Sequence, residues 1–160
     1  MNKILKALVV GSVFAVVGSN LVSAAGTADP VVGTWNLNLA KSKFTPGPAP
    51  KSATRSYTQT ADETALTYSQ VNADGTTASG ESKFKFDGKD YAITGSPDYD
   101  MLSLSRVNAM TVKSRQKRNG KVVGTTIRTV SAGGRVLMLD STRKDAKGMK
   151  HHDVQVFDKQ

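Results

Sequence analysis

The chain has 160 residues, with 22 Lys and Arg against 13 Asp and Glu, and it contains no cysteine. Because no thiol is present, cysteine nucleophiles, zinc–cysteine sites and disulfide scaffolds are excluded. Residues 26–160 hold only 24 Leu, Ile, Val and Phe, which is below the roughly 20% that usually supports a solid core. These residues are therefore either partly disordered or folded around a centre that is not filled by its own side chains.

The first 25 residues have the pattern of an export signal. Lys3 and Lys6 precede an apolar run over residues 7–17, and the small residues Ala24 and Ala25 follow a short polar stretch. This order is typical of a secretory signal peptide, and the run is shorter than the roughly 20 apolar residues that span a bilayer. We predict a cleaved signal helix over 1–25 and one exported domain over 26–160, periplasmic or extracellular, with no transmembrane segment in the mature chain. A secreted chain without disulfides suits a bacterial source.

The rest of the sequence predicts strands and turns. Turn-forming residues such as Asn119 and Gly120 recur about every 8 to 14 residues, the spacing of an antiparallel sheet. Polar and apolar side chains alternate between the turns, as at Leu66, Tyr68 and Gln70, and no apolar run has helical spacing. Ten strands are predicted, over residues 32–39, 54–60, 65–72, 77–86, 90–94, 101–107, 110–118, 121–130, 135–142 and 151–157.

Ten strands joined by short turns favour an all-β, antiparallel up-and-down barrel, because closing the sheet removes its edges. A barrel of that size can hold a ligand or water in its interior, which agrees with the low apolar content. The alternative is a two-sheet sandwich, which would need a denser apolar face on most strands. The proline-rich stretch over residues 45–50 is predicted to be a rigid loop within the domain.

Gly33-Thr34-Trp35 opens the first predicted strand. This Gly-x-Trp pattern resembles the calycin superfamily of lipocalins, fatty-acid-binding proteins and avidins, in which it plugs the closed end of a barrel. The late hairpin around Asn119-Gly120 is similar to that of the fatty-acid-binding branch. The whole mature chain resembles small exported bacterial proteins described as lipocalin-like. The resemblance implies a ligand-binding barrel and structural roles for Gly33 and Trp35.

The sequence departs from the named branches at three places. Fatty-acid-binding proteins cover the barrel with a helix pair after the first strand, but here residues 40–53 are short and contain three prolines, so the mouth is expected to be open. Their last strand carries Arg-x-Tyr to clamp a carboxylate, where this chain has Gln155 and Phe157. The single tryptophan argues against an avidin-type biotin site, which uses several.

Positive charge is concentrated late in the chain. Residues 26–100 have a net charge of −2 and residues 101–160 a net charge of +9. Much of this charge lies on the hairpin around Asn119-Gly120, whose two-residue turn predicts that Val112 faces Ile127. With both pointing inward, Lys113, Arg115 and Lys117 form an outward stripe; a slip of one residue would place these bases and Arg128 inside.

Chemistry-bearing motifs are sparse. The only histidines, His151 and His152, precede Asp153; on a strand, His151 and Asp153 share one face and His152 the other, which makes a poor metal site. Haem ligation would require one histidine to face the cavity. Carboxylates at 87–90 and 98–100 lie in turns, where Asp commonly bonds to the backbone. No nucleophile elbow, phosphate loop or zinc-protease motif is present, so we predict no catalytic residue, metal or cofactor; a barrel enzyme is the weakest alternative.

We therefore predict a monomeric, non-catalytic barrel that binds a small apolar or amphipathic molecule. The candidate lining residues are Tyr57, Tyr68, Phe84, Arg106, Arg128, Gln155 and Phe157. On the last strand, the alternation favours Val154 and Val156 pointing inward, whereas the resemblance favours Gln155 and Phe157. The alternative function is an envelope module that binds anionic lipid headgroups or polysaccharide through Lys113, Arg115 and Lys117. Nucleic acid is not expected as a partner, because the hairpin lacks aromatic side chains for stacking.

Overall fold

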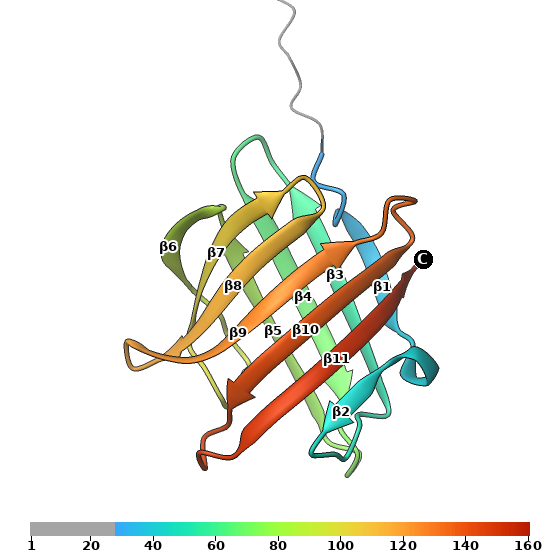
Figure 1. Ribbon diagram of the computed structural model, residues 1–160, viewed down its shortest axis with the longest axis vertical. Helices are drawn as coiled ribbons and strands as arrows, with labels where there is room; N and C mark the ends of the chain where they lie inside the picture. Colours follow the sequence, from blue (N-terminus) through green and yellow to red (C-terminus); the bar gives the residue numbers. More distant parts are fainter. Residues whose placement is uncertain (1–27) are drawn as a thin grey trace, which may run out of the picture.

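The computed structural model describes residues 28–160, so the predicted leader lies outside the described residues. The described chain contains eleven strands and one 3-10 turn, without an α-helix (Figure 1). None of its helical segments is long and apolar enough to cross a membrane. The elements are β1 (Gly33–Leu37), η1 (Leu39–Lys41), β2 (Lys43–Thr45), β3 (Ser52–Gln59), β4 (Thr64–Val71), β5 (Thr77–Phe84), β6 (Asp87–Ala92), β7 (Met101–Asn108), β8 (Thr111–Arg118), β9 (Lys121–Val130), β10 (Val136–Lys144) and β11 (Lys150–Lys159).

Ten of these strands form one antiparallel meander that curls into a nearly closed barrel (Figure 1). The strand order is β5-β4-β3-β1-β11-β10-β9-β8-β7-β6. All ten predicted strands are present, and the up-and-down barrel predicted from the alternation is confirmed. The addition is β2, a short strand that ends where the predicted proline-rich loop begins and that pairs with β11 beside the main path.

The barrel closes where its two edge strands, β5 and β6, approach each other; we call this place the seam. Gly80 and Gly95 allow the two backbones to come close there. A bridge joins Ser82 to Ile93, and the Thr94 N–H donates to the Glu81 carbonyl at 3.0 Å. A Cβ on Gly80 would lie 2.0 Å from the Thr94 carbonyl oxygen, and one on Gly95 would lie 1.8 Å from that of Ser79. Side chains at either glycine would therefore force the seam open, and the barrel would lose its closure.

The hairpin between β8 and β9 corrects the predicted register. The turn forms as predicted, with positive φ at Asn119 (51°) and Gly120 (74°). Beyond it, a β-bulge leaves Val123 without an opposite residue, so Val112 lies opposite Arg128 instead of Ile127. Val112 is buried as predicted, but Ile127 faces outward and Arg128 faces inward.

The closed end of the barrel, called the floor below, is built around Trp35. Its indole is fully buried and its Nε1–H donates to the Val31 carbonyl at 2.7 Å, while the Lys159 Nζ lies 5.1 Å from the ring centroid. Gly33 has φ of 129°, and a Cβ there would lie 2.6 Å from the Lys159 side chain. Gly33 and Trp35 thus lie together at the closed end of the barrel, and their structural roles stay predictions.

Candidate functional site

The barrel encloses a cavity of about 560 Å³ that extends to the end opposite the floor. Its outer rim, the mouth, is formed by residues of the loops 46–51, 72–76 and 93–100. The inner lining has two characters. Strands β3 to β7 contribute mainly apolar and aromatic side chains: Tyr57, Leu66, Tyr68, Phe84, Leu102 and Leu104. Strands β8 to β11 contribute mainly polar ones: Ser114, Gln116, Thr126, Ser141, Arg143, Asp153 and Gln155.

Part of the polar wall is internally hydrogen-bonded. The Gln116 amide Nε2 donates to Thr126 Oγ1 at 2.6 Å, and the Thr126 and Ser141 hydroxyls lie 2.8 Å apart. The Gln116 Oε1 is buried and has no hydrogen-bond partner among residues 28–160. These hydroxyls and amides hold β8, β9 and β10 in register, so they support the wall as well as lining it.

At the floor, one carboxylate serves two arginines. Asp29 is buried, and its Oδ2 lies 2.8 Å from an Arg106 guanidinium nitrogen and 3.1 Å from one of Arg128. Burial raises the pKa of Asp29, but Arg128, the Val31 N–H and Arg106 together outweigh it and hold the pKa below its ordinary value. The remaining guanidinium surface of Arg128 faces the rings of Tyr57 and Phe86. The floor thus has one arginine more than it has carboxylates, and the Nε and Nη1 atoms of Arg128 have no hydrogen-bond partner among residues 28–160.

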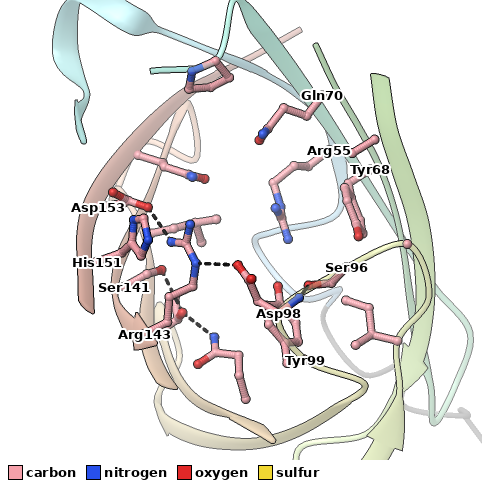
Figure 2. A pocket seen from close by; sticks show the side chains of 18 of the residues that line it. Arg55, Tyr68, Gln70, Ser96, Asp98, Tyr99, Ser141, Arg143, His151 and Asp153 are labelled. Carbon is pink, nitrogen blue, oxygen red and sulfur yellow. Dashed lines mark hydrogen bonds and ion pairs between the residues drawn. The ribbon is translucent and has the colours of Figure 1, made fainter. Parts of the chain in front are cut away.

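Near the mouth, Arg143 joins two carboxylates across the cavity wall (Figure 2). Its Nε donates to Asp98 at 3.3 Å and its Nη1 donates to Asp153. Burial opposes the charge of Arg143, but Asp153 and Asp98 raise its pKa above the ordinary value. Asp98 also accepts the Ala146 N–H at 3.2 Å. This cluster fastens the β6–β7 loop to the strands on the opposite side of the mouth.

Arg55 enters the same cavity from β3, and Figure 2 shows it beside Tyr68, facing the Arg143 cluster. Its Nε donates to the Tyr57 hydroxyl at 3.1 Å, and its guanidinium carbon lies 5.6 Å from the Tyr68 ring centroid. Within residues 28–160, no carboxylate is in ion-pair distance of Arg55. Burial raises the pKa of Tyr68, whose neutral hydroxyl donates to the Thr94 carbonyl at 3.0 Å.

The structure brings together most of the residues predicted to line the cavity. Two of them lie elsewhere. Arg106 turns away from the cavity to Asp29 and the Phe86 ring, 4.2 Å from its centroid, and Phe157 is fully buried in the core. The predicted residues that do line the cavity are Tyr57, Tyr68, Phe84, Arg128 and Gln155. Whether any of them binds a ligand stays a prediction.

On the last strand, Gln155 and Phe157 point inward, as the resemblance implied, and the inward placement favoured by the alternation is wrong. Val154 and Val156 are half-buried on the outer side because the segment from Asn38 to Thr45 covers them. Lys43 pairs with Val154, and the Asn38 N–H donates to the Val156 carbonyl at 2.8 Å. The apolar side chains of β11 are thus used on both faces.

Arg55, Arg143 and the buried Asp153 also line the cavity and were not predicted to do so from the sequence. A signal for Arg55 exists, because Arg55 is two residues from Tyr57 and therefore shares its face of the strand. Arg143 likewise shares a face with Ser141. Neither arginine was predicted to line the cavity, because charged side chains are generally expected to face solvent.

The predicted outward stripe is present on β8. Lys113 and Arg115 are exposed, and no carboxylate of the described chain is in ion-pair distance of either. Lys117 is half-buried and its Nζ lies 2.7 Å from Asp90. The stripe therefore offers two free cations on the outer surface.

The histidines lie on opposite faces of β11, as the alternation predicted. His151 lines the cavity with its Nε2 at 3.2 Å from Asp145, whereas His152 faces outward with its Nε2 at 2.9 Å from Asp140. In the part of the chain that the structure describes, no three His, Asp or Glu side chains form a group that could hold a metal ion.

No family model matches this chain, and no curated protein matches it. Among solved structures, the chain is similar to zebrafish ileal bile acid-binding protein complexed with cholic acid, at 14% identity and a TM-score of 0.48, covering 82% of this chain and 99% of that one. It is also similar to the siderocalin Ex-FABP, which functions through dual ligand specificities, at 12% identity and a TM-score of 0.39, covering 82% and 74%. Likenesses this distant leave the ligand of the present barrel open.

Proposed function

We propose that this barrel binds a small amphipathic molecule in its cavity without carrying out chemistry on it. The observation that supports the proposal is the cavity itself. Its volume of about 560 Å³ falls within the range of roughly 300–1,000 Å³ that is usual for small-molecule sites. An apolar wall on β3 to β7 faces a polar wall on β8 to β11, and this division suits a ligand with one apolar and one polar side.

Non-catalytic binding is favoured by the state of the polar groups. Arg143, Asp98 and Asp153 bond to one another, and His151 lies against Asp145. The Arg143 cluster fastens the β6–β7 loop to β10 and β11, and this structural role accounts for its charged groups without a reaction. The arrangement therefore supports recognition of a ligand rather than proton transfer to it.

The test uses a neutral dye that fluoresces in apolar surroundings, N-phenyl-1-naphthylamine. We expect its emission to rise on addition of the protein and to saturate at one dye per chain. Ser114→Phe fills the cavity from β8, because Ser114 lines it, and should abolish the signal. Lys113→Phe adds the same ring to the outer face, where Lys113 is exposed, and should leave cavity binding intact.

The result against the proposal would be absence of saturable binding to the folded wild-type protein, or equal signals from both phenylalanine variants. Native mass spectrometry of protein purified from its own host provides a complementary measurement. A small molecule that copurifies with the wild type and is absent from Ser114→Phe would identify the occupant.

Export is part of the same proposal and is supported by the signal pattern of residues 1–25. Cell fractionation followed by N-terminal sequencing tests it. We expect a mature chain that starts at Ala25 or Gly26 outside the cytoplasm. A full-length chain confined to the cytoplasm would contradict export and would leave the cavity proposal untouched.

A second candidate function is binding to an anionic envelope surface, supported by the exposed and unpaired Lys113 and Arg115. Free cations on a protein surface attract phospholipid headgroups and acidic polysaccharide. Replacing Lys113, Arg115 and Lys117 by Ser should abolish binding to heparin and to vesicles that contain phosphatidylglycerol. If this variant binds both as well as the wild type does, the surface function is wrong.

A further inference from the structure

We propose that Arg55 is the anion-binding group of the cavity, and that the ligand is an amphipathic molecule with a single negatively charged oxyanion group. The proposal rests on the proposed function, because it names the chemistry of a ligand in the same cavity. The arginines that line this cavity differ in whether they contact a carboxylate. Arg128 and Arg143 contact carboxylates, whereas Arg55 contacts none in residues 28–160.

The free donors of Arg55 define what it can recognise. A guanidinium has five N–H donors in a planar fork, and only the Nε–H of Arg55 has a partner, the Tyr57 hydroxyl at 3.1 Å. For the four N–H bonds of its two terminal nitrogens, residues 28–160 supply no acceptor. Two parallel N–H bonds from such a fork fit the two oxygens of a carboxylate, or two oxygens of a sulfonate.

The surroundings of Arg55 strengthen an interaction with an anion. Tyr57 and Tyr68 flank it, and Figure 2 shows that it extends from the β3 wall into the space near Tyr99. Aromatic rings replace water around the guanidinium, so its attraction for a negative charge is less screened than on the surface. An anion can therefore recover the solvation that Arg55 loses in the cavity.

The charges in the cavity favour one negative charge on the ligand. Asp29 is shared by Arg106 and Arg128 at the floor, and Arg143 is shared by Asp98 and Asp153 near the mouth. The floor has one arginine more than it has carboxylates, but Arg106 is partly exposed and does not line the cavity. The Arg143 cluster, nearer the mouth, has one carboxylate more than it has arginines. A dianion would leave a second negative charge facing Asp98, whereas a monoanion neutralises Arg55 alone. The carboxylate of Asp74 at the rim is not counted here, because Asp74 is exposed to solvent and lies near Lys51.

The position of Arg55 also orients the ligand. On β3, Arg55 lies between Ser52, next to the mouth loop 46–51, and Tyr57, whose ring faces Arg128 at the floor, so it lies between the mouth and the floor. Leu66, Phe84 and Leu102 line the same wall of the cavity. The apolar body of the ligand would pack on these side chains while its charged group meets Arg55.

The test compares two dyes with the same aromatic skeleton, N-phenyl-1-naphthylamine and its sulfonated relative 8-anilino-1-naphthalenesulfonate. Two charge-assisted hydrogen bonds to Arg55 should make the wild type bind the sulfonate at least about 10-fold more tightly than the neutral dye. In Arg55→Gln this preference should fall to within about 2-fold, while the affinity for the neutral dye is retained. Arg55→Lys keeps the charge without the planar fork and should keep part of the preference.

The control variant is Arg135→Gln, which removes the same charge from an exposed side chain in the β9–β10 turn and should leave the preference unchanged. Equal wild-type affinities for the two dyes, or a preference that survives in Arg55→Gln, would overturn the anion site and leave the proposed function standing. If the folded protein binds neither dye, the proposed function fails and the anion site fails with it. If Arg55→Gln does not fold, the ratio of the affinities for the two dyes, measured in the wild type and in Arg55→Lys, still tests the anion site.

Competition experiments then test the number of charges. 2-Naphthoate, naphthalene-2-sulfonate and 2-naphthyl phosphate carry different anions on one ring system. We expect the two monoanions to displace the sulfonated dye at lower concentrations than the phosphate does at pH 8, where the phosphate is doubly charged. Stronger displacement by the phosphate would overturn the single-charge part of the proposal, and a difference between carboxylate and sulfonate would identify which monoanion the site prefers.

Discussion

The floor and the middle of the barrel each place an arginine against Tyr57, Arg128 buried and Arg55 half-buried, and the charges of the two arginines are treated differently. At the floor, Arg128 packs against the Tyr57 ring and its charge is met by Asp29 at 3.1 Å. In the middle, Arg55 donates to the Tyr57 hydroxyl, and no carboxylate of the described chain meets its charge. Both arginines have N–H donors without partners, but the charge of Arg128 is paired with a carboxylate of the fold and the charge of Arg55 is not.

This difference separates residues that hold the barrel together from residues that are available to a ligand. A buried cation without a counterion costs free energy, so the fold supplies Asp29 where the space is closed. Where the space is open to a guest, we propose that the guest supplies the counterion. The two regions should therefore respond differently to substitution: the floor through stability and the middle through binding.

The largest effect is expected at Trp35, which is fully buried at the floor. Trp35→Ala should lower the free energy of unfolding by about 3–5 kcal/mol, because it deletes a large core side chain and leaves a void. Urea denaturation followed by circular dichroism measures the change. Trp35→Phe, which retains an aromatic ring, should lose less. If Trp35→Ala unfolds at the wild-type midpoint, the floor is not the structural anchor described here.

Asp29 should have the next largest effect. Asp29→Asn leaves Arg128 buried without its counterion and should cost about 3 kcal/mol of unfolding free energy. Arg106 has 36% of its side chain exposed, so its charge is partly solvated and adds less to the loss. The double variant that combines Asp29→Asn with Arg128→Met should be compared with Asp29→Asn alone, because it also removes the unpaired buried charge. This double variant should regain part of the stability, and no recovery would mean that the Asp29–Arg128 pair does not account for the loss.

The pH dependence of stability gives a smaller and separate measurement of the same pair. The pKa of Asp29 is lower in the folded protein than its ordinary value of 3.8, so the unfolded chain takes up the proton first as the pH falls. The stability that Asp29 contributes is present above pH 3.8 and is lost as the pH falls through its lower folded pKa. The wild type and Asp29→Asn should therefore converge in stability toward that pKa. A gap that stays constant from pH 7 down to pH 2 would contradict this account.

The barrel could be predicted from the sequence because local patterns carry it. Turn residues mark the strand ends, and alternation along each strand marks two faces, so ten strands follow without knowledge of their partners. The register of β8 and β9 could not be predicted, because the bulge at Val123 depends on how the whole sheet curves. The inward face of β11 was also ambiguous, because Val156 is covered by a segment more than one hundred residues earlier in the chain.

The cavity was harder to predict than the fold because its charges meet only in three dimensions. Asp29 and Arg128 are 99 positions apart, and no pattern in the sequence connects them. Arg128 was predicted to face the cavity, and Arg55, which has the same side chain on a strand of the same barrel, was overlooked. Which arginine has a counterion depends on which carboxylates the closed barrel brings near it.

The smallest stability change is expected for Arg55, and it completes the comparison. Arg55→Gln removes one hydrogen bond, to Tyr57, and also removes a charge held among aromatic rings without a carboxylate. The first change costs about 1 kcal/mol, and the second relieves a desolvation cost of similar size. The free energy of unfolding should therefore stay within about 1 kcal/mol of the wild type, in contrast to Asp29→Asn. Urea denaturation without added dye measures it. A loss as large as that of Asp29→Asn would make Arg55 part of the framework, because a side chain kept for a ligand contributes little to the stability of the empty barrel.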